Sequence, residues 1–421
     1  MYQKTTLPNG LRLVTASMPH TRSVSIGFFI GVGSRYESAP QAGISHFIEH
    51  MCFKGTARRR TPGEISAAIE GVGGMLNGGT DKEMTIYWCK VAQPHFLLAM
   101  DVLADMLLNS RFDAADVDKE RQVIIDEIKM TKDTPSQEVS LLIDEILWPD
   151  HPLGRDTAGT VESVVATDRN ALLECMNSRY LPSNTVLAIS GSIDHEAALD
   201  AVNQALGRWQ KPAPSPDFLP YFENKNPRVR VEKRETEQAH LCLALPGLSM
   251  VHPKRFVHDL LNVILGEGMS SRLFTEIRDN LGLAYSIYSY VDHFLDSGAM
   301  TVGASVEPGN LSTTVKATLQ QLSLIKEKIV PDSELAKAKE LSKGRTLLRM
   351  EDSRNVNGWI GAQEVLTGNI MTVDEVIAIV DAITAEDIRE LARELLVGDR
   401  LRLAVVGPIS KEEKLEELLK L

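Results

Sequence analysis

The sequence predicts an α+β protein made of two similar α/β domains, each with a mixed, antiparallel-rich sheet and helices. Three observations predict this class. A chain of 421 residues is too long for one compact core. Short strand-like segments alternate with longer helical segments in its first part. The two halves of the chain also end in similar segments, as an internal repeat would.

Hydrophobic periodicity assigns the elements of the first half in order. Residues 11–17 (LRLVTAS) and 23–31 (SVSIGFFIG) predict strands, and helices are expected to begin near Ile44 and near Thr61. Apolar and polar residues alternate in residues 83–91 (EMTIYWCKV), which favours an edge strand. Long helical stretches follow. The strands are hairpin-like and form no regular βαβ repeat, so a mixed sheet is expected.

A proline-rich segment divides the chain nearly in half. Residues 211–227 contain five prolines and no helical or strand periodicity, so we expect a linker between domains at 1–210 and 228–421. Residues 178–196 and 392–412 each run from a helix end through a turn and an apolar strand to Gly-x-Ile. This similarity predicts an internal duplication of one α/β domain.

Composition and charge exclude several classes of protein. A net charge of -12 disfavours non-specific binding to nucleic acid or to anionic membrane. No apolar run approaches the ~20 residues that span a bilayer. The amino terminus has no signal- or transit-peptide pattern, so a cytoplasmic location is expected, although a mature form without its leader would look the same. The cysteines lack CxxC spacing and are expected to be reduced core residues: Cys52, Cys89, Cys175 and Cys242.

Two histidines and a glutamate share one sector of the helix predicted from Ile44. Each residue of an α-helix advances about 100°, so His46, Glu49 and His50 project to the same side. Two imidazoles at this spacing chelate one zinc ion, and the carboxylate between them is placed to hydrogen-bond the metal's water. The order His-x-x-Glu-His is the inverted form of the thermolysin-type motif. The corresponding positions of the second half hold no histidine, so only the first half carries this chemistry.

A catalytic zinc ion needs a third protein ligand, normally a carboxylate from elsewhere in the chain. The helix predicted at residues 113–133 offers Glu120 and Glu127, which share a face. The alternative interpretation is that these glutamates are solvated residues of an exposed helix face. The sequence pattern alone does not identify Glu127, rather than its neighbours, as the third ligand.

Longer stretches around these residues resemble a known family. Residues 43–56 (GISHFIEHMCFKGT), followed later by residues 120–128 (ERQVIIDEI), are similar to the pitrilysin-type (M16) zinc peptidases. The resemblance is strongest to the half-length branch that includes mitochondrial processing peptidase and its bacterial relatives, and it covers nearly the whole chain. It implies one zinc ion per chain, with His46, His50 and Glu127 as its three ligands. It also implies that Glu49 is the general base and that Glu120 is an acidic residue that supports the site.

Two further segments extend the resemblance. Residues 75–87 are similar to the family's substrate-strand segment, with Gly78 in place of the usual alanine. The positions that match this segment are Asn77, Thr80, Glu83, Thr85 and Tyr87. Residues 265–285 are similar to the family's carboxy-half signature, with Glu267 in place of a glycine. There the resemblance implies substrate contacts for Arg278 and Tyr285, which would otherwise be interpreted as a solvated helix residue and a core aromatic.

The resemblance implies a zinc-dependent endopeptidase that hydrolyses unstructured peptides or leader segments. Longer family members close two halves around a chamber, and this chain supplies half of such a clamshell, so a homodimer is expected. Arg278 and Tyr285 would then complete the active site of the opposite subunit. Two alternatives remain: a processing-peptidase catalytic subunit that needs an inactive partner chain, and a non-catalytic assembly or binding subunit, which the intact motif disfavours.

Overall fold

The computed structural model describes residues 2–209, 216–223, 228–409 and 415–421, which form two compact units. The first unit comprises Met1–Lys129, Arg155–Leu219 and Leu347–Thr372. The second comprises Met130–Gly154, Pro220–Thr346 and Val373–Leu421. Each unit therefore includes a helical segment from the other half of the sequence. Within the expected linker, residues 216–223 form neither helix nor strand, and the remainder of 211–227 lies outside the described residues.

The first unit is built on a six-stranded mixed sheet. Its strands are β1 (Tyr2–Thr6), β2 (Arg12–Ser17), β3 (Ser23–Ile30), β4 (Met75–Thr80), β5 (Thr85–Ala92) and β6 (Thr185–Gly191). Their order is β1-β2-β6-β3-β5-β4. Only β2 and β6 run parallel, and the other neighbours are antiparallel. The sheet is therefore mixed and antiparallel-rich, as predicted.

The prediction of an edge strand within residues 83–91 is wrong. Strand β5 pairs with β3 on one side and with β4 on the other, so the edge strand is β4. The alternation in β5 reflects how its two faces are covered: Tyr87 and Cys89 are buried in the core, whereas Trp88 and Lys90 are half-buried. Alternation reports which face is buried, and it carries no information about strand neighbours.

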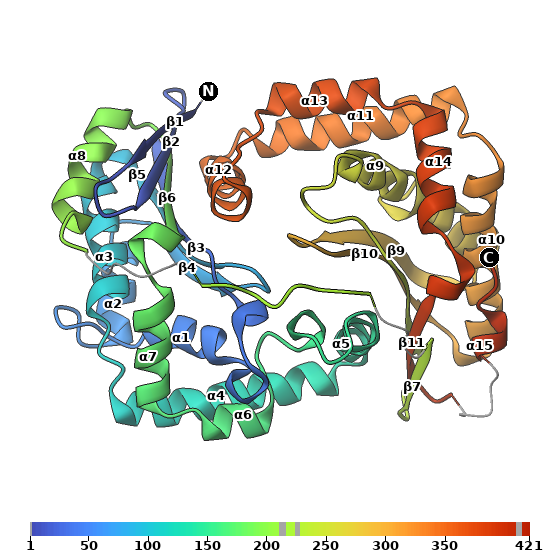
Figure 1. The fold of residues 1–421 in the computed structure, drawn as a ribbon, viewed down its shortest axis with the longest axis horizontal. Coiled ribbons are helices and arrows are strands. Elements are labelled where there is room, and N and C mark those ends of the chain that lie inside the picture. Colours follow the sequence, from blue (N-terminus) through green and yellow to red (C-terminus); the bar gives the residue numbers. More distant parts are fainter. Residues whose placement is uncertain (1, 210–215, 224–227, 410–414) are drawn as a thin grey trace. The chain divides into compact units, whose positions relative to one another are not determined.

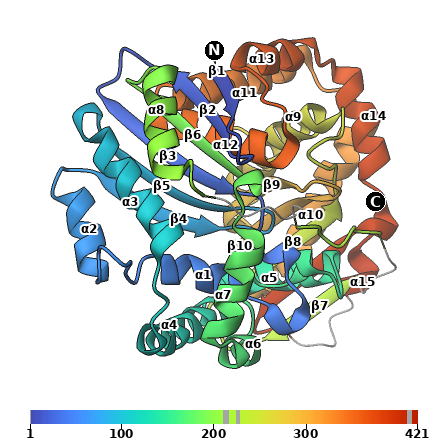
Figure 2. The ribbon, with the colours of Figure 1, turned by 60° about the vertical axis from the view of Figure 1, so that its left-hand side comes forward.

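Helices cover both faces of the first sheet (Figure 1). The helices are α1 (Ile44–Cys52), α2 (Pro62–Glu70), α3 (Phe96–Asn109), α4 (Ala114–Asp133), α6 (Val161–Ala166), α7 (Arg169–Arg179), α8 (His195–Leu206) and α12 (Ser353–Thr367). In Figure 2, α3 and α8 lie in front of the strands. The opposite face is covered by α12, where Ile360 packs with Phe29 and Ala188. Helix α4 begins in the first unit and ends in the second.

The second unit repeats this strand order in a five-stranded sheet. Its strands are β7 (Val229–Lys233), β8 (Ala239–Pro246), β9 (Ala284–His293), β10 (Gly298–Val306) and β11 (Arg402–Gly407). In the order β7-β11-β8-β10-β9, β11 is parallel to β7 and antiparallel to β8, as β6 is to β2 and β3. The shared order supports the predicted duplication, in which β11 and β6 are the two similar apolar strands.

Alternate residues of β8 separate the two faces of the second sheet. Leu241 and Leu243 belong to the core that contains α9 and α10, whereas Cys242 and Ala244 pack with α5 on the other face. The helices are α5 (Pro135–Leu147), α9 (Arg255–Gly266), the π-helix η6 (Phe274–Asn280), α10 (Leu311–Glu327), α11 (Asp332–Arg349), α13 (Val373–Ala382), α14 (Ala385–Leu395) and α15 (Leu415–Leu418). Helix α5 thus takes the place on this sheet that α12 takes on the first.

The prediction that the cysteines are reduced core residues is confirmed. All four cysteines are buried and unpaired. None of the helices in the described residues combines the length and the apolar character needed to cross a bilayer.

Candidate metal centre

The start of α1 is fixed by a glycine and a buried carboxylate. Gly43 precedes the helix with φ of 88°, and a Cβ there would lie 2.3 Å from the Ala158 carbonyl oxygen, so only glycine fits. The two carboxylate oxygens of Glu37 accept hydrogen bonds from the backbone N–H groups of Gly43 and Ser45, both at 2.8 Å. Burial raises the pKa of Glu37 to about 7, although these hydrogen bonds oppose the rise. The helix therefore begins at a defined residue, as predicted near Ile44.

The apolar face of α1 orients its polar face. Phe47, Ile48 and Met51 are fully buried in the core of the first unit. His46 and His50 are half-buried and project from the other side of the same helix. The periodicity that buries one face therefore places both imidazoles together, as the sequence predicts.

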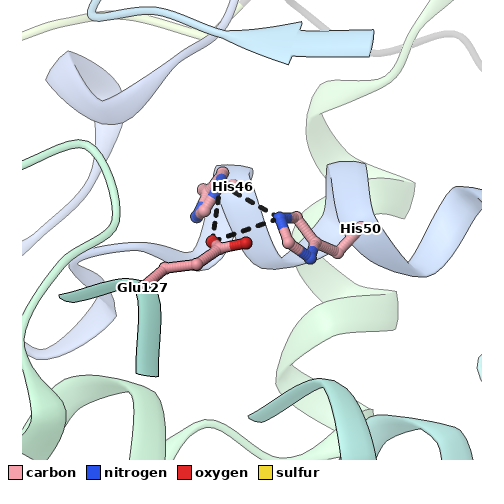
Figure 3. Close-up of side chains that lie close together, drawn as sticks. All are labelled: His46, His50 and Glu127. Atoms are coloured by element: carbon pink, nitrogen blue, oxygen red, sulfur yellow. Dashed lines mark hydrogen bonds and ion pairs between the residues drawn. The ribbon is translucent and has the colours of Figure 1, made fainter. Parts of the chain in front are cut away.

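His46 and His50 converge with Glu127 of α4 on one point (Figure 3). Their Nε2 atoms are 3.1 Å apart, and Glu127 Oε2 lies 3.8 Å from His46 Nε2 and 3.6 Å from His50 Nε2. Tetrahedral zinc with bonds of about 2.0–2.1 Å places its donor atoms about 3.3 Å apart. These three residues are the one group of potential metal ligands found in the described parts of the chain. Their donor types and spacing fit a zinc ion.

Burial keeps His46 neutral. It lowers the pKa of His46 to about 4, with a further contribution from the charge of His50. The buried Nδ1 atom of His46 has no hydrogen-bond partner among the described residues. A neutral imidazole is the form that ligates zinc.

Glu120 orients the imidazole ring of His50 through a hydrogen bond. Its Oε2 lies 3.0 Å from His50 Nδ1, and its Oε1 lies 2.6 Å from Lys54 Nζ. Because the carboxylate accepts, His50 Nδ1 carries the proton and its Nε2 keeps a free lone pair. Burial lowers the pKa of His50, but the bond to Glu120 and the charges of Glu127 and Glu49 outweigh it and raise that pKa. Burial raises the pKa of Glu120, and its bonds to His50 and Lys54 outweigh burial and lower it.

The side chain of Glu49 extends from α1 toward the edge strand β4. Its Oε2 accepts a hydrogen bond from Thr80 Oγ1 at 2.8 Å. A Cβ added at Gly78 would lie 3.0 Å from both Glu49 Oε1 and the Phe53 ring. The absence of a side chain at Gly78 therefore leaves room for the carboxylate. Burial is the main cause that raises the pKa of Glu49, although the Thr80 hydrogen bond lowers it.

The other residues of the predicted substrate strand divide into two groups. Asn77 is exposed on β4, where its Oδ1 accepts a hydrogen bond from the N–H of Gly78. Glu83 is buried and forms an ion pair with Arg35 at 2.5 Å. Thr85 donates to the Val32 carbonyl oxygen. The matching positions beyond β4 therefore stabilise the fold.

Arg278 and Tyr285 belong to the second unit, on η6 and β9. The guanidinium of Arg278 lies 5.2 Å from the centre of the Tyr285 ring. Tyr285 is 77% exposed, so its interpretation as a core aromatic is wrong. Glu267, the departure from the glycine signature, forms an ion pair with Arg345 of α11.

Sequence reasoning missed two residues that support the site, Glu37 and Lys54. Lys54 lies one helical turn beyond His50, and that spacing was a signal for a side chain on the same line of α1. Glu37 gave no such signal, because it reaches α1 through an irregular loop.

Comparison with known proteins assigns the family. The model of the insulinase family (peptidase family M16) matches residues 12–161, and the model of the peptidase M16 inactive domain matches residues 166–342. An uncharacterized zinc protease of Streptomyces coelicolor is 38% identical over 418 residues, which cover 98% of this chain and 90% of that protein. The uncharacterized zinc protease YmxG of Bacillus subtilis is 36% identical, with 97% of this chain and 98% of that protein covered.

Solved structures have the same fold. A protease from Helicobacter pylori superimposes with a TM-score of 0.90 at 20% identity, covering 97% of this chain and 99% of that one. A peptidase M16 inactive domain from Pseudomonas fluorescens gives a TM-score of 0.88 at 19% identity, covering 97% and 98%. With family models and relatives that together span nearly the whole chain, the protein is a half-length, zinc-protease-like member of peptidase family M16.

Proposed function

We propose that the protein is a zinc-dependent endopeptidase that hydrolyses unstructured peptides or leader segments. The convergence of His46, His50 and Glu127 on one point, with Glu49 on the same helix, is the observation that carries this proposal. The names of the relatives in Streptomyces coelicolor and Bacillus subtilis, both zinc proteases, agree with it.

In this proposal His46, His50 and Glu127 would hold one zinc ion per chain. When bound, the ion would supply Lewis acidity, which would activate water and polarise a peptide carbonyl. Glu49 acts as the general base: it takes a proton from the attacking water and delivers it to the leaving amine. Burial, which raises the pKa of Glu49, suits a group that must both accept and return a proton. Thr80 orients one carboxylate oxygen of Glu49 through a hydrogen bond, and Glu120 orients the His50 ring through another.

The edge strand β4 is the proposed docking strand for the peptide. It pairs only with β5 among the described strands, so its outer edge offers backbone groups to an extended chain. Asn77, Gly78 and Thr80 lie on this strand, and the last two lie next to Glu49. Docking by backbone hydrogen bonds selects for an extended conformation more than for particular side chains. It therefore favours unstructured substrates, which can adopt that conformation.

We further propose that the enzyme works as a homodimer that encloses its substrate. Arg278 and Tyr285, which contact one another in the second unit, would complete the active site of the opposite subunit. A mixed dimer of Glu49→Gln and Arg278→Ala chains tests this. Completion between subunits predicts one doubly damaged site and one intact site, and therefore about half of the wild-type activity. Loss of all activity in the mixed dimer would contradict it. Wild-type protein that cleaves peptide only when a second, different chain is added would favour the heterodimer instead.

Zinc content and peptide cleavage of three variants test the chemistry. Glu49→Gln should keep zinc and lose turnover, because the base is not a ligand. Glu127→Gln should lose zinc as well as turnover. Glu174→Gln, an exposed glutamate of α7 in the same unit, is the matched control and should retain both. Turnover retained in Glu49→Gln would contradict the proposed role of Glu49 as the general base.

A further inference from the structure

We propose that Lys54 is a positioning residue of the metal centre, which holds the Glu120 carboxylate in the orientation that fixes His50. The inference rests on the proposed role of His50 as a zinc ligand. It concerns a residue outside the ligand set, at the end of α1.

The two oxygens of Glu120 have different partners. Oε1 lies 2.6 Å from Lys54 Nζ, and Oε2 lies 3.0 Å from His50 Nδ1. Glu120 is only 6% exposed, so little solvent is available to replace either partner. A carboxylate held by one cation and one N–H group has a defined rotation, whereas a carboxylate held by His50 alone is free to turn about that bond.

The backbone anchors Lys54 where this contact is possible. Its N–H group donates to the Met51 carbonyl oxygen at 3.1 Å, in the turn that ends α1. Its side chain is 28% exposed, so the ammonium reaches inward over the helix end. Lys54 lies four residues after His50 and two beyond the end of α1, and its Nζ reaches Glu120 of α4.

The Lys54–Glu120 contact acts on the tautomer and the orientation of the His50 ring. A fixed Glu120 oxygen keeps the proton on Nδ1 and leaves the Nε2 lone pair free on the side where His46 Nε2, 3.1 Å away, and Glu127 converge. Residues that orient a ligand in this way typically contribute about 10- to 100-fold to metal affinity. Lys54 acts through one further contact, so we expect an effect near the lower end, about tenfold.

A purely structural role is the competing explanation. A lysine at the carboxyl end of a helix also stabilises the helix dipole, and that role involves neither zinc nor the His50 tautomer. Lys90 of β5 provides a matched control. Its Nζ lies 2.6 Å from Asp352 Oδ2 and its side chain is 25% exposed, close to the values for Lys54, but it has no part in the proposed site.

The test compares Lys54→Met, Lys54→Arg and Lys90→Met in the full-length apo protein. Zinc affinity is measured by competition with a chromophoric chelator, and the tautomer of His50 is measured from its imidazole nitrogen chemical shifts. Lys54→Met should raise the zinc Kd about tenfold. In this variant the nitrogen chemical shifts of His50 should indicate a mixture of tautomers instead of the Nδ1–H tautomer alone. Lys54→Arg should recover most of both, and Lys90→Met should match wild type.

Two results would overturn the proposal: a wild-type zinc Kd in Lys54→Met, or a weakened Kd with the His50 tautomer unchanged. Neither readout involves hydrolysis. A wild-type protein that binds zinc but cleaves no peptide therefore refutes only the proposed function. A wild-type protease whose zinc Kd is insensitive to Lys54→Met refutes only this inference.

Discussion

Removing the hydroxyl of Thr80 tests how much catalysis depends on the orientation of Glu49. Thr80 Oγ1 donates to Glu49 Oε2 at 2.8 Å, and a hydrogen bond to a charged group contributes about 1.5–3 kcal/mol. Valine replaces the hydroxyl with a methyl group of similar size and suits a strand. If the bond acts fully in the transition state, Thr80→Val should lower kcat by roughly 10- to 150-fold.

The assay is cleavage of a short fluorogenic peptide with zinc in excess, and the zinc content of each protein is measured in parallel. Thr80→Ser keeps the hydroxyl and should stay close to wild type. Because the Thr80 bond lowers the pKa of Glu49, its loss should also move the acidic limb of the kcat profile to higher pH. An unchanged kcat in Thr80→Val would refute the reasoning. A change confined to KM would assign Thr80 to substrate binding alone.

Three further predictions follow from the site. Gly78→Ala should lower kcat only slightly at unchanged zinc content, because its Cβ would lie 3.0 Å from Glu49 Oε1, a flexible side-chain end that needs to shift by only a few tenths of an ångström, and alanine is the usual residue of the resembled segment; a loss of most of the turnover in steady-state assays would contradict this. Removal of the metal with a strong chelator should abolish peptide cleavage and added zinc should restore it, whereas cleavage by metal-free protein would count against zinc. Burial raises the pKa of Glu37 from 4.5 to about 7, so between these values the folded state binds more protons than the unfolded chain and loses stability as pH rises. Urea unfolding from about pH 5 to 8 should therefore show wild type losing stability relative to Glu37→Gln, and parallel profiles would show that Glu37 does not titrate in this range.

The parts of the site that lie on one helix were predictable from the sequence. Helix geometry alone places His46, Glu49 and His50 together, and the fold confirms that the two imidazoles face one point. Glu127 was a candidate on its helix, and only the packing of α4 against α1 distinguishes it from its neighbours.

Features that depend on contacts between distant elements were not predictable. The Lys54–Glu120 ion pair joins the turn after α1 to α4, and the spacing from His50 does not identify Glu120 as the partner of Lys54. The alternation in residues 83–91 identified a strand but not its neighbours, so β5 was placed at the edge that β4 occupies. The sequence predicted long helical stretches after residues 83–91, without indicating which sheet α5 would cover.

The exchange of α5 and α12 between the units sets an order of events during synthesis. The ribosome releases α1 and α4 early, but the helix that covers Phe29 and Ala188 belongs to Leu347–Thr372. One apolar face of the unit that contains the candidate metal centre therefore stays uncovered while most of the remaining chain is translated. Nascent chains stalled before residue 347 should aggregate unless a chaperone binds them, and a protein truncated after Leu219 should not fold stably.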